Sequence, residues 1–185
     1  IIDDLIVTNW SDKLFIVVNA SRKDIDLPLI ANAAAGKAEL EIVEDRALLA
    51  LQGPAAASVT SAHAPDTNDM AFMSAAEISI NGVPCHITRS GYTGEDGYEI
   101  SVPADATVAL TRALLDAEEV APIGLGARDS LRLEAGLCLY GHDIDTETTP
   151  VEASLVWAMQ KARRAGGARA GGFPGAEVIL DQLAN

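Results

Sequence analysis

The densest group of side chains that could do chemistry lies at residues 90–99, which read Ser-Gly-Tyr-Thr-Gly-Glu-Asp-Gly-Tyr-Glu. Three glycines in seven residues allow a tight turn with positive φ angles, and such a turn lets a ligand approach the backbone closely. The turn would present Tyr92, Glu95, Asp96 and Glu99 from one small region. From these residues alone, a ligand site and a plain β-turn with solvated acids are about equally good interpretations.

A second candidate is the run Arg-Asp-Ser-Leu-Arg-Leu-Glu-Ala-Gly at residues 128–136. Arg128 and Arg132 are four residues apart, so in a helix they share one face. Two arginines beside apolar surface can bind a planar or carboxylate ligand. Without further context, an amphipathic helix with a salt-bridged rim is the simpler interpretation.

Asp3 and Asp4 form a third candidate, because they precede an apolar strand. Adjacent residues of a strand point to opposite faces, so at most one of the two carboxylates can enter a cleft. A solvated strand end is the alternative. The three histidines, His63, His86 and His142, fit no metal-ligand spacing, so we predict no metal site.

The elements that must position these groups are short strands mixed with helices. An Asn81-Gly82 turn predicts a tight hairpin, and Gly53-Pro54 predicts a helix start. Ser21 with Asp24, and Thr149 with Glu152, have the spacing of capping boxes. The predicted strands are 5–8, 14–19, 39–43, 47–51, 76–80, 85–88 and 98–102. The predicted helices are 22–35 (with Pro28 inside), 55–63, 105–117, 127–138, 150–161 and 176–183.

This alternation predicts an α+β fold with antiparallel sheets and packed helices, in place of a doubly wound parallel sheet. We expect two β-α-β-β units, at residues 1–46 and 47–122, followed by a helical segment at 123–185.

Composition limits the classes of partner. The chain has 27 acidic and 13 basic residues and a net charge of −14, which disfavours nucleic acid and anionic membrane surfaces. No apolar run approaches the roughly 20 residues that cross a bilayer. Cys85 and Cys138 form no C-x-x-C pair, so we expect two reduced thiols and a reducing compartment.

Five segments, in order, resemble the folate-dependent aminomethyltransferase family, the T-proteins of the glycine cleavage system, and the resemblance covers nearly the whole chain. The segments are Ile2-Asp-Asp-Leu-Ile-Val-Thr8, Ala47-Leu-Leu-Ala-Leu-Gln-Gly-Pro54, residues 89–101, residues 126–141 and Thr148-Thr-Pro-Val-Glu152. The resemblance implies a folate-binding fold with ferredoxin-like β-α-β-β units. It also implies transfer of a methylene carbon from the aminomethyl-dihydrolipoyl group of H-protein to tetrahydrofolate, with release of ammonia.

The resemblance assigns roles to individual residues. Glu99 would accept hydrogen bonds from the guanidine-like edge of the pterin, and Arg128 would hold the benzoyl-glutamate side of the folate. Asp4 would be the catalytic carboxylate that orients the attacking ring nitrogen and stabilises positive charge during transfer. Asn19, Val17 and Tyr92 match positions that line the pocket. We expect Asp4, Glu99 and Arg128 to converge on one cleft.

The family pattern also implies what lies outside this sequence. The chain lacks the N-terminal portion and the C-terminal β-barrel domain of the family, so we expect the isolated fragment to be weakly active or inactive. The implied compartment is the bacterial cytoplasm or the mitochondrial matrix.

Three alternatives stay open. A folate-binding assembly factor for iron–sulfur enzymes is disfavoured, because its Lys-Gly-Cys-Tyr-x-Gly-Gln-Glu motif is absent. A folate domain of a sarcosine or dimethylglycine dehydrogenase would be revealed by a dinucleotide-binding domain upstream. A purely structural or interaction module would bind no reduced folate.

Overall fold

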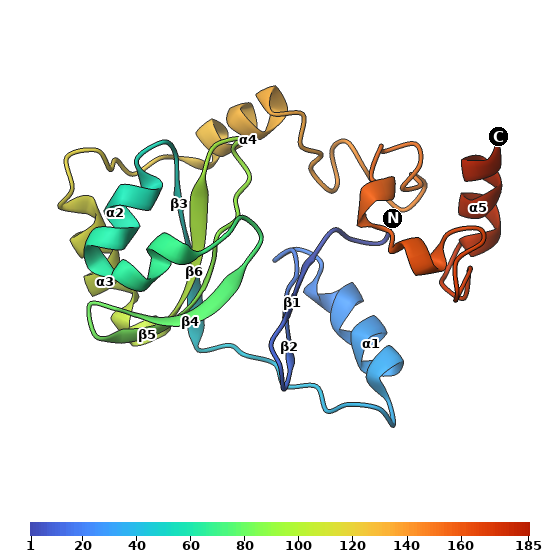
Figure 1. The fold of residues 1–185 in the computed structure, drawn as a ribbon, viewed down its shortest axis with the longest axis horizontal. Coiled ribbons are helices and arrows are strands. Elements are labelled where there is room, and N and C mark those ends of the chain that lie inside the picture. Colours follow the sequence, from blue (N-terminus) through green and yellow to red (C-terminus); the bar gives the residue numbers. More distant parts are fainter. The chain divides into compact units, whose positions relative to one another are not determined.

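The computed structural model describes residues 1–185, and the chain forms two compact units. The first unit combines Ile1–Ala38 with Cys138–Asn185, and the second is Glu39–Leu137. Each unit combines antiparallel strands with helices, which confirms the predicted α+β class (Figure 1). No helix is long and apolar enough to cross a bilayer.

The second unit is built on a four-stranded antiparallel sheet with the order β3-β6-β5-β4. Its elements are β3 (Arg46–Gln52), α2 (Ala56–His63), β4 (Ala75–Ile80), β5 (Val83–Thr88), β6 (Gly97–Pro103), α3 (Thr107–Leu115) and α4 (Leu125–Glu134). Helices α2 and α3 lie against one face of the sheet (Figure 1). Tyr98, Ile100 and Val102 alternate along β6 and are almost fully buried in the core on that face. The intervening Glu99 therefore belongs to the opposite face.

Residues with positive φ angles set the turn between β4 and β5 and the end of α4 in this unit. Asn81 and Gly82 both have positive φ angles, 51° and 82°, as a two-residue hairpin turn requires, so the predicted hairpin is confirmed. Helix α4 ends earlier than predicted. Gly136 takes a φ of 73°, and the Leu137 N–H donates back to the Arg132 carbonyl, which closes the helix before Cys138.

The first unit holds the predicted hairpin, with β1 (Ile6–Asn9) paired to β2 (Leu14–Val17), and α1 (Lys23–Ala34) follows it. Pro28 lies inside α1, as predicted. The Ser21 cap is wrong, because α1 begins after Arg22 with no side-chain cap bond. Residues 39–43 form no strand, so the third strand expected for this part of the chain is absent.

Thr149 and Glu152 form both bonds of the predicted capping box, at 2.8 and 3.2 Å, yet no long helix follows. Ser154 adopts a φ of 60°, and the Leu155 N–H donates to the Pro150 carbonyl. The helical conformation therefore ends after a single turn. Helix α5 (Ala176–Ala184) ends the chain. Short 3₁₀ segments are Pro65–Asp69, Ala104–Ala106, Val156–Ala158 and Lys161–Arg163.

Candidate functional site

Glu99 is held by hydroxyl groups at the edge of the glycine turn. It lies opposite Ala50 of β3 and Thr88 of β5 in the sheet. The Ser90 hydroxyl donates to Glu99 Oε2 at 3.2 Å and lies 2.7 Å from Thr88 Oγ1. Because Glu99 is half-buried and only one oxygen has a partner, the carboxylate is oriented and still able to accept further hydrogen bonds.

Gln52, which the sequence did not single out, fixes the backbone of the turn. Its Nε2 donates to the Ser90 carbonyl at 3.0 Å and to the Tyr98 carbonyl at 3.2 Å. A Cβ at Gly91 would lie 1.7 Å from Gln52 Oε1, and one at Gly97 would lie 2.5 Å from the same side chain. These two glycines are therefore required by the close approach of Gln52.

Asp96 is a structural residue of the turn. Its carboxylate accepts from Arg89 Nη2 at 2.6 Å and Nε at 3.0 Å, and its carbonyl accepts from the Gly53 N–H. The hydrogen bond from Arg89 is the main cause that lowers the pKa of Asp96 below its usual value. The Arg89 Nη1 also donates to the Met70 carbonyl at 2.7 Å, so the pair ties the turn to the preceding loop.

Arg128 and Tyr92 are brought together, although they lie 36 positions apart in the sequence. The Arg128 guanidinium lies over the Tyr92 ring, 4.6 Å from its centroid. Arg132 has a different role. It is 4% exposed and donates to Asp129 at 2.8 Å and to the Leu137 carbonyl at 3.2 Å, so it is committed to the end of α4. Of the two arginines, Arg128 is the one that can meet a ligand.

Gly94 joins the turn to α4. Its φ is +78°, and a Cβ added there would lie 2.7 Å from the Ala135 Cβ. This contact sets the position of the turn that carries Tyr92 against the helix that carries Arg128.

We expect Gly94→Ala to lower the free energy of unfolding by about 2 kcal/mol, because it combines a left-handed backbone with a steric overlap. Urea unfolding would measure the change. Gly126→Ala is the matched control, since Gly126 lies inside α4 with no atom within 4 Å of an added Cβ. The control should be neutral or slightly stabilising. An equal and small effect of both substitutions would contradict the Gly94–Ala135 contact.

Asp4 and Asn19 meet in the first unit. The Asn19 Nδ2 donates to Asp4 Oδ1 at 2.7 Å and to Asp3 Oδ1 at 2.8 Å, and the Asn19 backbone N–H donates to Asp3 Oδ2 at 3.3 Å. Val17 is the last residue of β2 and pairs with Ile6. Asp3 has both oxygens engaged, whereas Asp4 keeps one oxygen without a hydrogen bond. The geometry therefore favours Asp4 as the carboxylate that can act on a ligand.

Asp26, on the first turn of α1, is 3% exposed. Burial, and then the hydrogen bond and charge of Asp3, raise the pKa of Asp26 to about 6, while Arg22 acts in the opposite direction. Nothing in the sequence distinguishes this residue, because Asp24 and Asp26 both have the position of solvated acids at a helix start.

The predicted site residues thus fall into two groups. Asp4, Asn19 and Val17 belong to the first unit, and Glu99, Tyr92 and Arg128 belong to the second. Each group is held by its own hydrogen bonds or ring contact. The convergence of Asp4, Glu99 and Arg128 on one cleft stays a prediction.

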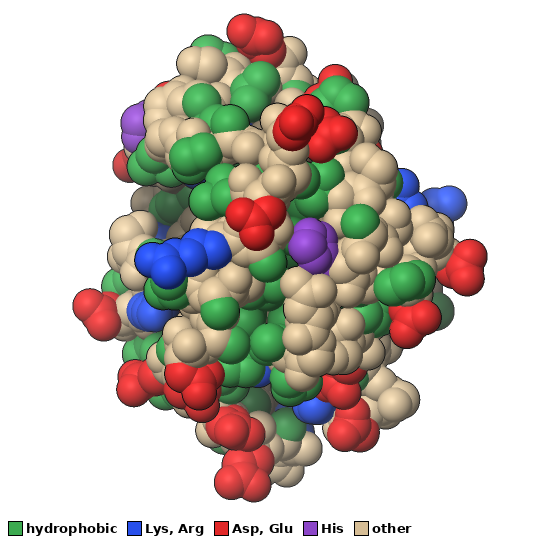
Figure 2. Space-filling model, turned by 90° about the vertical axis from the view of Figure 1, so that its left-hand side faces the viewer, with side chains coloured by type: hydrophobic (Ala, Val, Ile, Leu, Met, Phe, Trp, Pro, Cys, Tyr) green, Lys and Arg blue, Asp and Glu red, His purple; other side chains and the backbone are tan.

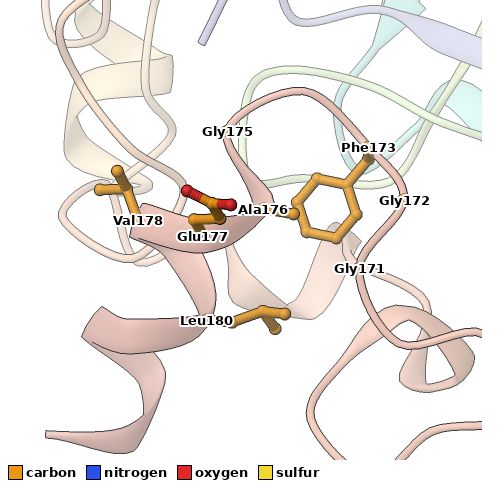
Figure 3. Close-up of a pocket in the computed structure, with 8 residues that line it drawn as sticks. All are labelled: Gly171, Gly172, Phe173, Gly175, Ala176, Glu177, Val178 and Leu180. Carbon is orange, nitrogen blue, oxygen red and sulfur yellow. The ribbon is translucent and has the colours of Figure 1, made fainter.

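Other surfaces offer less chemistry. A recess of about 570 Å³ next to α5 is lined by Gly171, Gly172, Phe173, Gly175, Ala176, Glu177, Val178 and Leu180, and holds none of the predicted site residues (Figure 3). No group of three or more His, Cys, Asp or Glu side chains could hold a metal ion. Acidic side chains are scattered over the face shown in Figure 2 and do not form one patch.

Comparisons with known proteins agree on one family. Residues 1–163 match the family model described as the GCVT N-terminal domain. The chain is 54% identical over 190 residues to the mitochondrial aminomethyltransferase of Canis lupus familiaris, covering 98% of this chain and 46% of that protein. It is 50% identical over 192 residues to the Solanum tuberosum counterpart, with the same two coverages. The chain therefore spans about half the length of the curated relatives it matches.

A solved structure gives the same result. The glycine cleavage system aminomethyltransferase T from Bartonella henselae aligns with a TM-score of 0.86 and 43% identity. The alignment covers 100% of this chain and 49% of that one. The fold described above is therefore similar to about half of that protein.

Proposed function

Because the chain belongs to the family of the GCVT N-terminal domain, we propose that it forms the tetrahydrofolate-binding part of an aminomethyltransferase of the glycine cleavage system. The reaction would take the methylene carbon from the aminomethyl-dihydrolipoyl arm of H-protein and pass it to tetrahydrofolate, releasing ammonia. The observation that supports this best is the Glu99 carboxylate, which Ser90 orients and which keeps an oxygen available for a ligand.

The proposed roles follow from the chemistry of reduced folate. The pterin edge donates hydrogen bonds, and a fixed carboxylate such as Glu99 accepts them with the strength of charge-assisted bonds. Arg128, whose guanidinium already stacks on Tyr92, would bind the carboxylate-bearing benzoyl-glutamate side. Asp4, held by Asn19, would stabilise positive charge that develops on the folate nitrogen during transfer.

The proposed compartment is reducing, either bacterial cytoplasm or mitochondrial matrix. Cys85 and Cys138 are both free thiols, and burial raises the pKa of Cys85, which keeps it protonated and unreactive. The relatives from Canis lupus familiaris and Solanum tuberosum carry the word mitochondrial in their names.

The test uses the intact protein, because the chain spans about half of its relatives. Calorimetric titration with tetrahydrofolate measures binding, and formation of 5,10-methylenetetrahydrofolate from aminomethyl-loaded H-protein measures turnover. Binding with turnover supports the proposal. Binding without turnover favours a folate domain of an amine dehydrogenase or a non-catalytic relative, and absence of binding favours an interaction module.

A further inference from the structure

Gln52 is the last residue of β3 and closes the glycine turn of residues 90–97, although the proposed mechanism gives it no role. Its Nε2 carries two hydrogens and donates to the Ser90 carbonyl at 3.0 Å and to the Tyr98 carbonyl at 3.2 Å. Ser90 stands where the chain enters the turn, and Tyr98 follows the last residue of the turn. A single amide group therefore ties the two ends of the turn together.

The backbone around Gln52 leaves room for this side chain and for little else. A Cβ on Gly91 would lie 1.7 Å from Gln52 Oε1, and one on Gly97 would lie 2.5 Å from the same amide. Gln52 Oε1 is buried and has no hydrogen-bond partner in the chain. A buried acceptor without a partner costs free energy, and proteins keep such local costs mainly at functional sites. The arrangement therefore indicates a role for Gln52 beyond its contribution to stability.

The first end of the turn carries the hydroxyl that orients Glu99. Ser90 is 4% exposed, and its hydroxyl donates to Glu99 Oε2 at 3.2 Å. Because a hydroxyl group has only one hydrogen, the 2.7 Å hydrogen bond between Thr88 and Ser90 is donated by Thr88. The backbone of Ser90, which Gln52 holds, thus sets the place of the hydroxyl on which the orientation of Glu99 depends.

The turn also carries the aromatic ring that supports Arg128. The Arg128 guanidinium lies over the Tyr92 ring, 4.6 Å from its centroid, and Tyr92 comes two residues after Ser90. Gly94 meets Ala135 at the end of α4, so the turn contacts the helix just beyond Tyr92. A movement of the turn would therefore move the surface on which the Arg128 guanidinium rests.

We propose that Gln52 is a positioning residue: by closing the glycine turn, it fixes the spacing between Glu99, which would hold the pterin, and Arg128, which would hold the benzoyl-glutamate. These ligand roles rest on the proposed function, whereas the link from Gln52 to the contacts of Ser90 and Tyr92 does not. A ligand held at both ends gains affinity when its two binding groups are kept at a fixed spacing, because the second contact then needs little further ordering. Gln52 thus favours a ligand that has both ends over one that has the pterin alone.

The variants are made in the intact protein. Gln52→Met keeps the length of the side chain and removes both donors. Gly91→Ala leaves Gln52 in the sequence but displaces its amide, and the φ angle of Gly91 is not in the left-handed region that would strain an alanine. Arg46→Met is the matched control, because Arg46 begins β3 and donates to the Ser101 hydroxyl and carbonyl at 2.8 and 2.6 Å. The control also removes two side-chain hydrogen bonds between β3 and β6, at the end of β3 away from the turn.

Three measurements are made on each variant. Calorimetry gives the Kd of tetrahydrofolate and that of 6-methyltetrahydropterin, which has the pterin ring but no benzoyl-glutamate. NMR of the ligand-free protein follows the Arg128 Nε–H resonance, because an N–H above an aromatic ring is shifted by the ring current. Urea unfolding gives the stability, so that a loss of affinity can be compared with a loss of stability.

Gln52→Met is expected to raise the Kd of tetrahydrofolate about tenfold and that of 6-methyltetrahydropterin no more than about threefold. Its Arg128 resonance should move toward the position seen in Tyr92→Leu, where the ring is absent. Gly91→Ala should act in the same direction, and adding it to Gln52→Met should change little further, because the amide is already gone. Arg46→Met should lose stability but keep the wild-type ratio of the two Kd values and the wild-type Arg128 resonance.

Equal changes of the two Kd values in Gln52→Met, or an Arg128 resonance that does not move, would overturn the proposal. The same change of the Kd ratio in Arg46→Met would also overturn it, because a general loosening of the sheet would then explain the effect. If Gln52→Met does not fold, as judged by circular dichroism, Gly91→Ala decides by the same two measurements. If the wild type does not bind tetrahydrofolate, the proposed function fails, and the Arg128 resonance still tests whether Gln52 holds the turn.

Discussion

Replacing Asp4 with alanine is expected to lower kcat for methylene transfer by about 10³-fold, within the range of roughly 10²–10⁴ for a positioned acid or base. The Kd for tetrahydrofolate should change less than about threefold. The difference arises because positive charge develops on the folate nitrogen during transfer, so a nearby carboxylate stabilises the transition state more than the bound ground state.

The surroundings of Asp4 support this separation. One oxygen of the carboxylate is fixed by Asn19 at 2.7 Å, and the other has no hydrogen-bond partner in the chain. A fixed and half-buried carboxylate does not need to reorganise when charge appears, which is the condition for a large electrostatic contribution. Asp4→Asn should recover little activity, because it keeps the shape of the side chain but removes its charge.

The measurements are single-turnover formation of 5,10-methylenetetrahydrofolate and calorimetric folate binding in the intact protein. Asp12→Ala is the control, since Asp12 is an exposed acid in the connection between β1 and β2 of the same unit. The control should leave both quantities unchanged. Equal losses of kcat and folate affinity in Asp4→Ala would show that Asp4 binds the folate and does not act in the transfer step.

Elements with local signals were predicted well from the sequence. Asn81-Gly82 fixes its hairpin because the turn needs two positive φ angles and little else. The capping box at Thr149 led to a wrong prediction of a long helix. Both capping bonds form, but the helical conformation ends after one turn at Ser154. A capping box stabilises a helix start, and it says nothing about how far the helix continues.

Residues whose importance comes from distant contacts could not be found this way. Gln52 is one polar residue at the end of a strand, and its role appears only when Ser90 and Tyr98, 38 and 46 positions away, supply carbonyls for its amide. Asp26 is indistinguishable from Asp24 by type or by place in the helix, and only packing makes one buried and the other exposed. Tertiary context therefore decides which polar residues matter.

The candidate site residues were predicted from the resemblance to the family, because the physical properties of the residues alone left their roles open. Glu99, Asp4 and Arg128 each had an ordinary alternative as a solvated acid or a helix-rim arginine. The structure adds local support that the pattern did not contain: the hydroxyl of Ser90 on Glu99, and the ring of Tyr92 under Arg128. It also removes Arg132 from the candidates, because that side chain serves the end of α4.

Glu99→Ala is expected to weaken tetrahydrofolate binding about 100-fold, equivalent to about 2.7 kcal/mol. That loss is the size expected when a charge-assisted pair of hydrogen bonds to a ligand is removed from a partly desolvated site. Because such bonds form in the ground state as well as in the transition state, kcat at saturating folate should change much less than the Kd. Calorimetric titration and initial rates over a range of folate concentrations would measure the two effects.

Glu99→Gln separates charge from shape. Glutamine can still accept the hydrogen bond from Ser90, so the sheet around β6 should stay folded, while the negative charge that attracts the pterin donors is lost. We expect it to lose most of the affinity that alanine loses. Glu95→Gln, an exposed acid in the same turn, should bind folate like the wild type. If Glu95→Gln weakened binding as much as Glu99→Gln, the net charge of the turn would explain the affinity, and Glu99 would have no specific role in holding the pterin.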